Sequence, residues 1–150
     1  MFVHSNWIKA GFLDKIKNLA SRRNFKDLTL SPLLSLTNDQ FHGHINSILQ
    51  MPGTSLLFGN HDLHKDRFPN CYGFVDPTAV MVPIDHFLND SYTPRLFTEL
   101  FGPFQMIVEY NDNDLNEKLL KVLERIPYNL TEGVVSNDPI FQTKILGIII

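Results

Sequence analysis

Apolar side chains recur at helical spacing in four stretches of this chain. In the first, Phe12, Ile16 and Leu19 share one face, which predicts a helix over about residues 8–23. Each of the other three stretches follows a residue that commonly caps a helix: Thr37, which can form a capping box with Gln40; Asp114; and Asp138, which Pro139 follows.

Strand patterns lie between the predicted helices. Residues 104–110 show the two-residue alternation of a β-strand. Shorter extended segments are predicted at residues 1–4, 54–58, 73–82 and 133–136, and Pro77 interrupts the third of them. Because strand, helix and strand follow one another over 104–136, we expect a parallel crossover unit and therefore an α/β fold.

The composition fits one globular domain. The chain has 150 residues, of which 43% are hydrophobic and 19% charged, and its net charge is -3. This charge provides no basic field, so neither nucleic acid nor an anionic membrane is an expected partner. Cys71 is the single cysteine, which excludes an internal disulfide and a multi-cysteine zinc site and favours a reducing, intracellular compartment.

Three polar patterns have ordinary interpretations. His42 and His44 are two residues apart on a predicted helix and would point in different directions. A basic cluster near the end of the first predicted helix favours a contact with the helix dipole over phosphate binding; it comprises Lys15, Lys17, Arg22 and Arg23. Residues 59–64 resemble a phosphoesterase metal motif, but a two-metal centre needs further ligands, so this metal site is a minor alternative.

The run Glu99-Leu100-Phe101-Gly102-Pro103 lies between a polar loop and the predicted strand at 104–110. It resembles the cofactor-side turn of the aldehyde dehydrogenases. Two longer runs resemble the same family in the same order, one before the turn and one after it: Cys71-Tyr72-Gly73-Phe74-Val75-Asp76-Pro77-Thr78 and Leu130-Thr131-Glu132-Gly133-Val134-Val135-Ser136-Asn137-Asp138. The chain as a whole is most similar to the plant-type delta-1-pyrroline-5-carboxylate dehydrogenase branch.

This resemblance implies both a fold and an activity. Residues 1–150 would form part of a three-layer αβα catalytic domain with a mostly parallel sheet. Complete enzymes of this branch oxidise glutamate semialdehyde (1-pyrroline-5-carboxylate) to glutamate with NAD, in mitochondrial proline catabolism. Glu99 corresponds to the residue that accepts hydrogen bonds from the nicotinamide ribose, and Phe101 to the aromatic side chain beside the nicotinamide. Gly102 and Pro103 would set the turn through backbone freedom and a fixed φ.

By the same resemblance, the catalytic groups fall outside this sequence. The nucleophilic cysteine would precede the strand at residues 1–4, and the general-base glutamate and the dinucleotide-binding half would lie further upstream. Cys71 has no Lys, Arg or helix start beside it that would activate its thiol. We therefore assign no catalytic residue to this chain and expect it to be a fragment, inactive on its own.

Two interpretations of the fragment remain open. The first is a piece of an NAD-dependent aldehyde dehydrogenase, which would act on a small aldehyde together with a complementing fragment or as a homo-oligomer. The second is a non-enzymatic remnant that acts as an interaction module, docking onto an intact homologue. In both cases the missing strands would leave sheet edges and apolar faces open, so we expect the isolated chain to aggregate or to be loosely packed.

Overall fold

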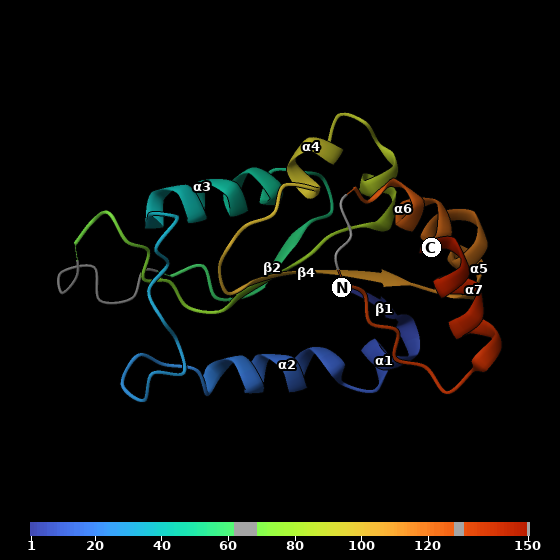
Figure 1. Ribbon diagram of the computed structural model, residues 1–150, viewed down its shortest axis with the longest axis horizontal. Coiled ribbons are helices and arrows are strands. Elements are labelled where there is room, and N and C mark those ends of the chain that lie inside the picture. The colour runs from blue at the N-terminus through green and yellow to red at the C-terminus, as the bar shows by residue number, and fades with distance from the viewer. Residues whose placement is uncertain (62–68, 128–130, 150) are drawn as a thin grey trace.

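The computed structural model describes residues 1–61, 69–127 and 131–149 and contains one four-stranded sheet (Figure 1). The strands are β1 (Phe2–His4), β2 (Ser55–Phe58), β3 (Thr78–Met81) and β4 (Phe104–Tyr110), in the order β1-β4-β3-β2. Both β1 and β3 pair with β4 in parallel, whereas β2 is antiparallel to β3. The predicted α/β class with a mostly parallel sheet is therefore confirmed.

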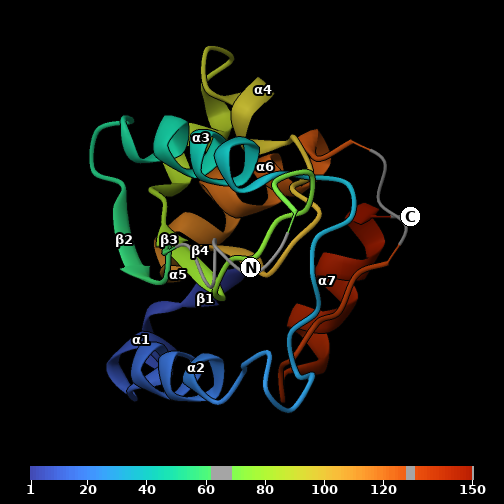
Figure 2. The same ribbon diagram turned by 90° about the vertical axis from the view of Figure 1, so that its left-hand side faces the viewer.

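Helices cover both faces of the sheet and make three layers (Figure 2). On one face lie α1 (Ser5–Lys9) and α2 (Phe12–Ser21); on the other lie α3 (Asn38–Leu49), the 3-10 helix η2 (Ile84–Leu88), α4 (Thr93–Leu96) and α6 (Leu120–Arg125). The chain also contains α5 (Asp112–Asp114), the π-helix η3 (Leu115–Leu119) and α7 (Pro139–Ile149). No helix within the described ranges is both long and apolar enough to cross a bilayer.

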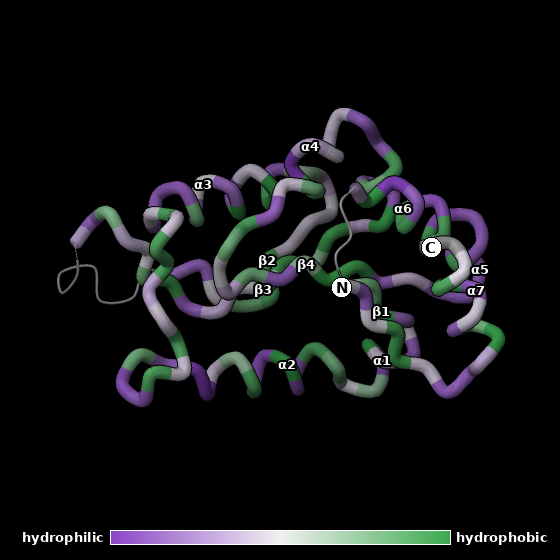
Figure 3. The backbone as a smooth tube through the Cα atoms, viewed as in Figure 1, coloured by the Kyte–Doolittle hydropathy of each residue, from purple (hydrophilic) through white to green (hydrophobic). Residues whose placement is uncertain are grey.

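Two apolar clusters hold these layers together. Ile107 of β4 and Ala79 of β3 are buried against side chains of α1 and α2, including Phe12 and Ile16. Their neighbours Val108 and Val80 belong to the larger cluster on the opposite face, which α3, η2 and α6 cover. Because successive strand residues face opposite sides of a sheet, each strand contributes to both clusters. Along α2, hydrophobic residues recur between groups of hydrophilic ones, as expected for a helix that packs one face against the sheet (Figure 3).

The predicted helix over residues 8–23 is two helices. The chain adopts a left-handed conformation at Gly11, with φ of 83°, which ends the first helix and starts the second. The apolar spacing continues across this break, and for that reason the pattern indicated one helix.

The last turn of α2 contains no basic residue, and Arg22 follows it as the C-cap. A contact with the helix dipole therefore does not account for Lys15 and Lys17.

The prediction of a crossover unit over residues 104–136 is wrong for its last strand. Residues 133–136 are described by the structure but form no strand, and Val135 is 86% exposed. The parallel pairs come instead from β1 and β3 beside β4.

The predicted helix near Asp114 begins slightly earlier, because Asn111 is the cap and Asp114 is its partner in a capping box. In the 73–82 segment, only the four residues of β3 form a strand.

The capping box at the start of α3 provides a test of local stability. Thr37 accepts a hydrogen bond from the Gln40 backbone N–H at 3.2 Å, and the Gln40 side chain accepts one from the Thr37 N–H at 2.9 Å. We expect Thr37→Ala to lower the free energy of unfolding by about 1 kcal/mol, measured by urea denaturation. Ser35→Ala is the control, because Ser35 is exposed and outside the capping box. Equal effects of the two substitutions would contradict this role.

Candidate cofactor site

The turn at residues 98–102 borders a groove of about 540 Å³. The groove lies at the amino end of β4, and Met1 and Phe2 of the neighbouring strand line it too. Glu99 is exposed at the groove, and the Phe101 ring is 65% exposed. The structure therefore places both predicted cofactor-binding residues on one turn beside one groove.

The backbone of this turn is anchored at both neighbouring strands. The Thr78 N–H, at the start of β3, donates to the Pro103 carbonyl at 2.8 Å, and the Phe104 N–H donates to the Gly102 carbonyl at 2.8 Å. Upstream, the Thr98 hydroxyl donates to the Pro94 carbonyl of α4 at 2.6 Å. The side chains of Glu99 and Phe101 thus project from a turn whose two ends are fixed.

Gly102 is required for space, not for the backbone freedom that the sequence suggested. It is absent from the positive-φ glycines, which are Gly11, Gly53 and Gly59. A Cβ atom at Gly102 would instead lie 2.9 Å from Cε2 of Phe41 and 3.2 Å from Cδ1 of Leu33. Phe41 is completely buried and cannot move aside freely. The close approach of the turn to α3 therefore demands glycine.

Aromatic rings form the support behind the groove. Phe104 meets the rings of Phe41 and His44 edge-on, with centroids 6.4 Å and 6.3 Å apart. Phe2 meets Phe87 in the same way at 5.8 Å. These contacts make the base of the groove apolar, whereas Glu99, Thr98 and Gln105 supply polar groups at its border.

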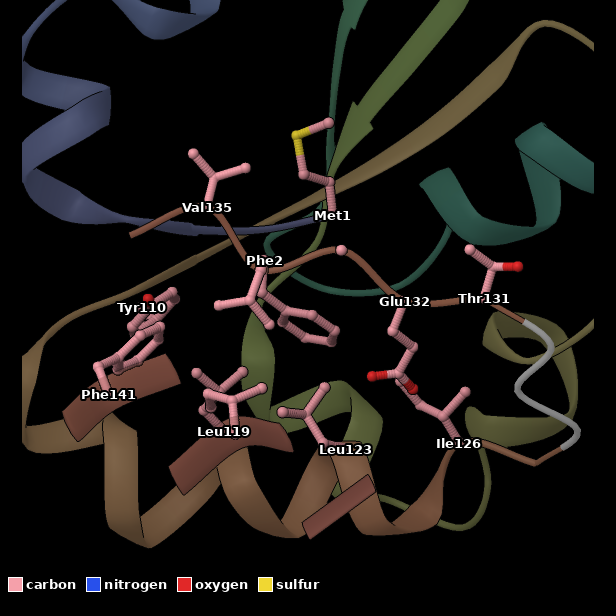
Figure 4. Close-up of a pocket in the computed structure, with 13 residues that line it drawn as sticks. Met1, Phe2, Tyr110, Leu119, Leu123, Ile126, Thr131, Glu132, Val135 and Phe141 are labelled. Carbon is pink, nitrogen blue, oxygen red and sulfur yellow. The ribbon is translucent and has the colours of Figure 1, made fainter. Parts of the chain in front are cut away.

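A second pocket of about 400 Å³ adjoins the groove and is shown in Figure 4. Met1, Phe2 and Ile126 line both spaces. The amino group of Met1 donates to the Met106 carbonyl at 2.8 Å, and burial lowers its pKa to about 6. In Figure 4 the Glu132 side chain, just before the segment that was predicted to be a strand, points toward Ile126.

Two of the histidines given ordinary interpretations in the sequence, His42 and His61, have side-chain partners. The Asn60 side chain contacts the His42 ring, with Oδ1 and Nδ1 2.7 Å apart, and His61 Nδ1 lies 3.1 Å from an Asp76 oxygen. His44 points to Phe104 instead, so the two histidines of α3 diverge as predicted. Residues 62–64 of the metal motif lie outside the described residues. Within the described ones, no group of three His, Cys, Asp or Glu could hold a metal.

Two curated relatives align with 98% of this chain. No family model matches it. Delta-1-pyrroline-5-carboxylate dehydrogenase 12A1, a mitochondrial protein of Arabidopsis thaliana, is 45% identical over 148 residues, which are 98% of this chain and 26% of that protein. This chain is homologous to a segment of the aldehyde dehydrogenases. The predicted resemblance, including its plant-type branch, is therefore confirmed, and the chain spans about a quarter of the length of the curated relatives that it matches.

Solved aldehyde dehydrogenases share the fold. The delta-pyrroline-5-carboxylate dehydrogenase of Mycobacterium tuberculosis superposes with a TM-score of 0.70 at 19% identity, over 98% of this chain and 26% of that one. Succinic semialdehyde dehydrogenase of Streptococcus pyogenes, in complex with NADP+, gives a TM-score of 0.70 at 17% identity, over 99% of this chain and 30% of that one. The NADP+ belongs to the Streptococcus pyogenes structure, and the likeness to this chain is one of fold.

The turn of this aldehyde dehydrogenase segment could be identified from the sequence, but the residues that support the turn could not. Phe41 and Leu33 lie about sixty residues before the turn, and their contact with Gly102 follows only from the fold. The wall formed by Met1 and Phe2 was also missed, because the alternation of β1 does not show which groove its first residues border. A glycine between an aromatic residue and a proline, just before a strand, was the one available signal of a close approach.

Substitution of Gly102 tests the contact with α3. We expect Gly102→Ala to lower the free energy of unfolding by about 1–3 kcal/mol, because the new methyl group overlaps the buried Phe41 ring. Gly133→Ala is the matched control, since a Cβ there meets no atom within 4 Å. Urea denaturation of both variants measures the difference. A Gly102→Ala protein as stable as Gly133→Ala would show that the turn does not need glycine.

His44 makes stability depend on pH. Its Nε2 atom is buried with no hydrogen-bond partner in the described part of the chain, and desolvation lowers the pKa of this histidine. The fold thus favours neutral His44. The contribution of this histidine to the free energy of unfolding is therefore complete above the ordinary histidine pKa of about 6.5 and is lost as pH falls below it. We expect urea midpoints to fall between pH 7.5 and pH 5, and less so in His44→Phe. Parallel pH curves for the two proteins would contradict this origin.

Proposed function

We propose that the groove at Glu99 and Phe101 is one wall of an NAD site in an aldehyde dehydrogenase that oxidises glutamate semialdehyde to glutamate. The observation that carries this proposal is the position of a free carboxylate and an exposed ring on one anchored turn. The 45% identity to a delta-1-pyrroline-5-carboxylate dehydrogenase supports the choice of substrate. By the same relation, we propose a mitochondrial location and a role in proline catabolism.

The two side chains suit the two parts of the cofactor. A carboxylate accepts hydrogen bonds from both hydroxyls of a cis-diol, as Glu99 would from the nicotinamide ribose. The Phe101 ring offers an apolar face against which a flat ring can lie. The cofactor supplies the hydride acceptor, so the contribution of this chain is to hold and orient it.

The chain should not act alone. Aldehyde oxidation in this family needs a thiolate nucleophile and a general-base glutamate, which the resemblance places before Met1. Cys71 is exposed in a loop, away from the residues that line the groove. We therefore propose that residues 1–150 are part of a catalytic domain and become active only with a complementing fragment that supplies the remaining segments. The enzyme assembled in this way would also be able to form a homo-oligomer.

Two exposed apolar side chains at the groove favour a second candidate function. Met1 and Phe101 are large and more than half exposed there, which is typical of a surface that another protein covers. The chain could then be a non-enzymatic interaction module that docks onto an intact homologue.

Complementation distinguishes the two functions. This chain is mixed with the preceding part of the Arabidopsis thaliana relative, and NADH formation from glutamate semialdehyde is followed by absorbance. We expect activity from the mixture and none from either piece. Association without activity would support the interaction module and overturn the split enzyme.

The role of Glu99 is tested in the same mixture. We expect Glu99→Gln to raise the KM for NAD about ten-fold, because the amide accepts only one of the two hydroxyl hydrogen bonds with full strength; this equals about 1.4 kcal/mol. Glu109→Gln is the control, since Glu109 is also exposed but lies outside the groove. An unchanged KM in Glu99→Gln would refute the assignment.

A further inference from the structure

A cavity of about 490 Å³ lies on the face of the sheet opposite to α3 and α4. The C-terminal half of α2, the loop at residues 23–26, the end of β2 and residues 76–77 line it. It shares no lining residue with the groove at Glu99. Its size falls in the range of about 300–1,000 Å³ that is usual for small-molecule pockets.

Three cations line this cavity and outnumber the carboxylates among its described lining residues. Lys17, Arg23 and Lys26 are exposed there, and none of them forms an ion pair with a described residue. Asp76 is the one carboxylate among the described lining residues, and both of its oxygens contact His61, at 2.9 Å from the backbone nitrogen and 3.1 Å from Nδ1. The cavity is therefore locally positive in a chain whose net charge is -3.

Two aromatic rings form apolar walls of the same cavity. Phe25 and Phe58 both line it and are both half-buried. Phe25 is held by Phe74, with ring centroids 5.3 Å apart, and Phe58 packs against the cluster of Val3, Ala79 and Ile107. These contacts fix the rings before any ligand arrives, which lowers the entropic cost of binding.

The loop that carries the cations is fixed by its own hydrogen bonds. The Asn24 side chain accepts from the Lys26 backbone N–H at 2.8 Å, and the Asn24 N–H donates to the Thr29 hydroxyl at 2.8 Å. The Leu30 N–H donates to the Asn24 carbonyl at 3.1 Å. Stabilisation of the helix dipole does not account for all three cations, because Lys17 lies before the last turn of α2 and Lys26 lies in the loop beyond its end. The shared feature of the three cations is the cavity.

We propose that this cavity binds a nucleoside phosphate. The flat base would lie against Phe25 and Phe58, and the phosphates would contact Lys17, Arg23 and Lys26. Rings favour a flat partner through stacking, and lysine and arginine favour phosphate through charge-assisted hydrogen bonds. The ligand is a free nucleotide in this proposal, since a net charge of -3 gives the chain no overall basic field that would attract a nucleic acid strand.

Calorimetric titration of the full chain with ADP tests the proposal. We expect saturable binding of ADP, at least ten-fold tighter than binding of either pyrophosphate or adenosine. The double variant Arg23→Glu with Lys26→Glu should weaken ADP binding at least ten-fold. The matched control is Lys9→Glu with Lys15→Glu, which changes the charge equally at positions outside the cavity and should retain tight binding.

Four outcomes would overturn the proposal. They are absence of saturable ADP binding, equal binding of pyrophosphate and ADP, equal loss in the two double variants, and loss of ADP binding in Glu99→Gln. The last would place ADP in the groove of the proposed NAD site, so the two sites are tested separately. Circular dichroism of each variant checks that the exposed substitutions leave the fold intact.

Discussion

Burial of β4 on both faces is the constraint on which the other layers depend. Ile107 and Val108 are both inaccessible to solvent, yet they face opposite helical layers. Parallel strands need helices on both sides, because neither face can be left to water without exposing apolar side chains. The strands β1 and β3 both pair with β4, and residues of β4 line both the groove and its neighbouring pocket.

The same constraint explains why the turn before β4 can be so well defined. A turn that enters a buried central strand must satisfy its backbone groups close to the sheet, and Thr78 and Gly102 provide those partners. The turn also passes close to the ring of Phe41 on the helical layer. The exposed side chains of Glu99 and Phe101 are therefore carried by a backbone that is held from two directions.

Much of the fold could be predicted from the sequence where one signal was strong. The seven-residue alternation of β4 and the capping box at Thr37 are local patterns with one physical meaning, and both are confirmed. Where a pattern was short, it failed: four residues at 133–136 cannot distinguish a strand from an irregular segment, because a strand also needs a partner. Gly11 divided a helix whose apolar spacing was continuous.

The groove itself was predictable only in part. Glu99 and Phe101 could be found from a run of five residues, but Phe41, Leu33 and Phe2 come from distant parts of the chain. Such contacts depend on the order of the strands in the sheet, which local periodicity does not contain. The cavity beside α2 has the same origin, since its cations and rings come from three separate segments.

The position of Met1 has a practical consequence for handling the protein. Its amino group is directed at the Met106 carbonyl, between the groove and the neighbouring pocket, and its carbonyl accepts from the Val108 N–H at 2.9 Å. Any affinity tag or fusion partner joined ahead of Met1 has to leave through this space. It would occupy the wall that Met1 and Phe2 form, and measurements of ligand binding made with such a protein would report on the tag as well as on the groove.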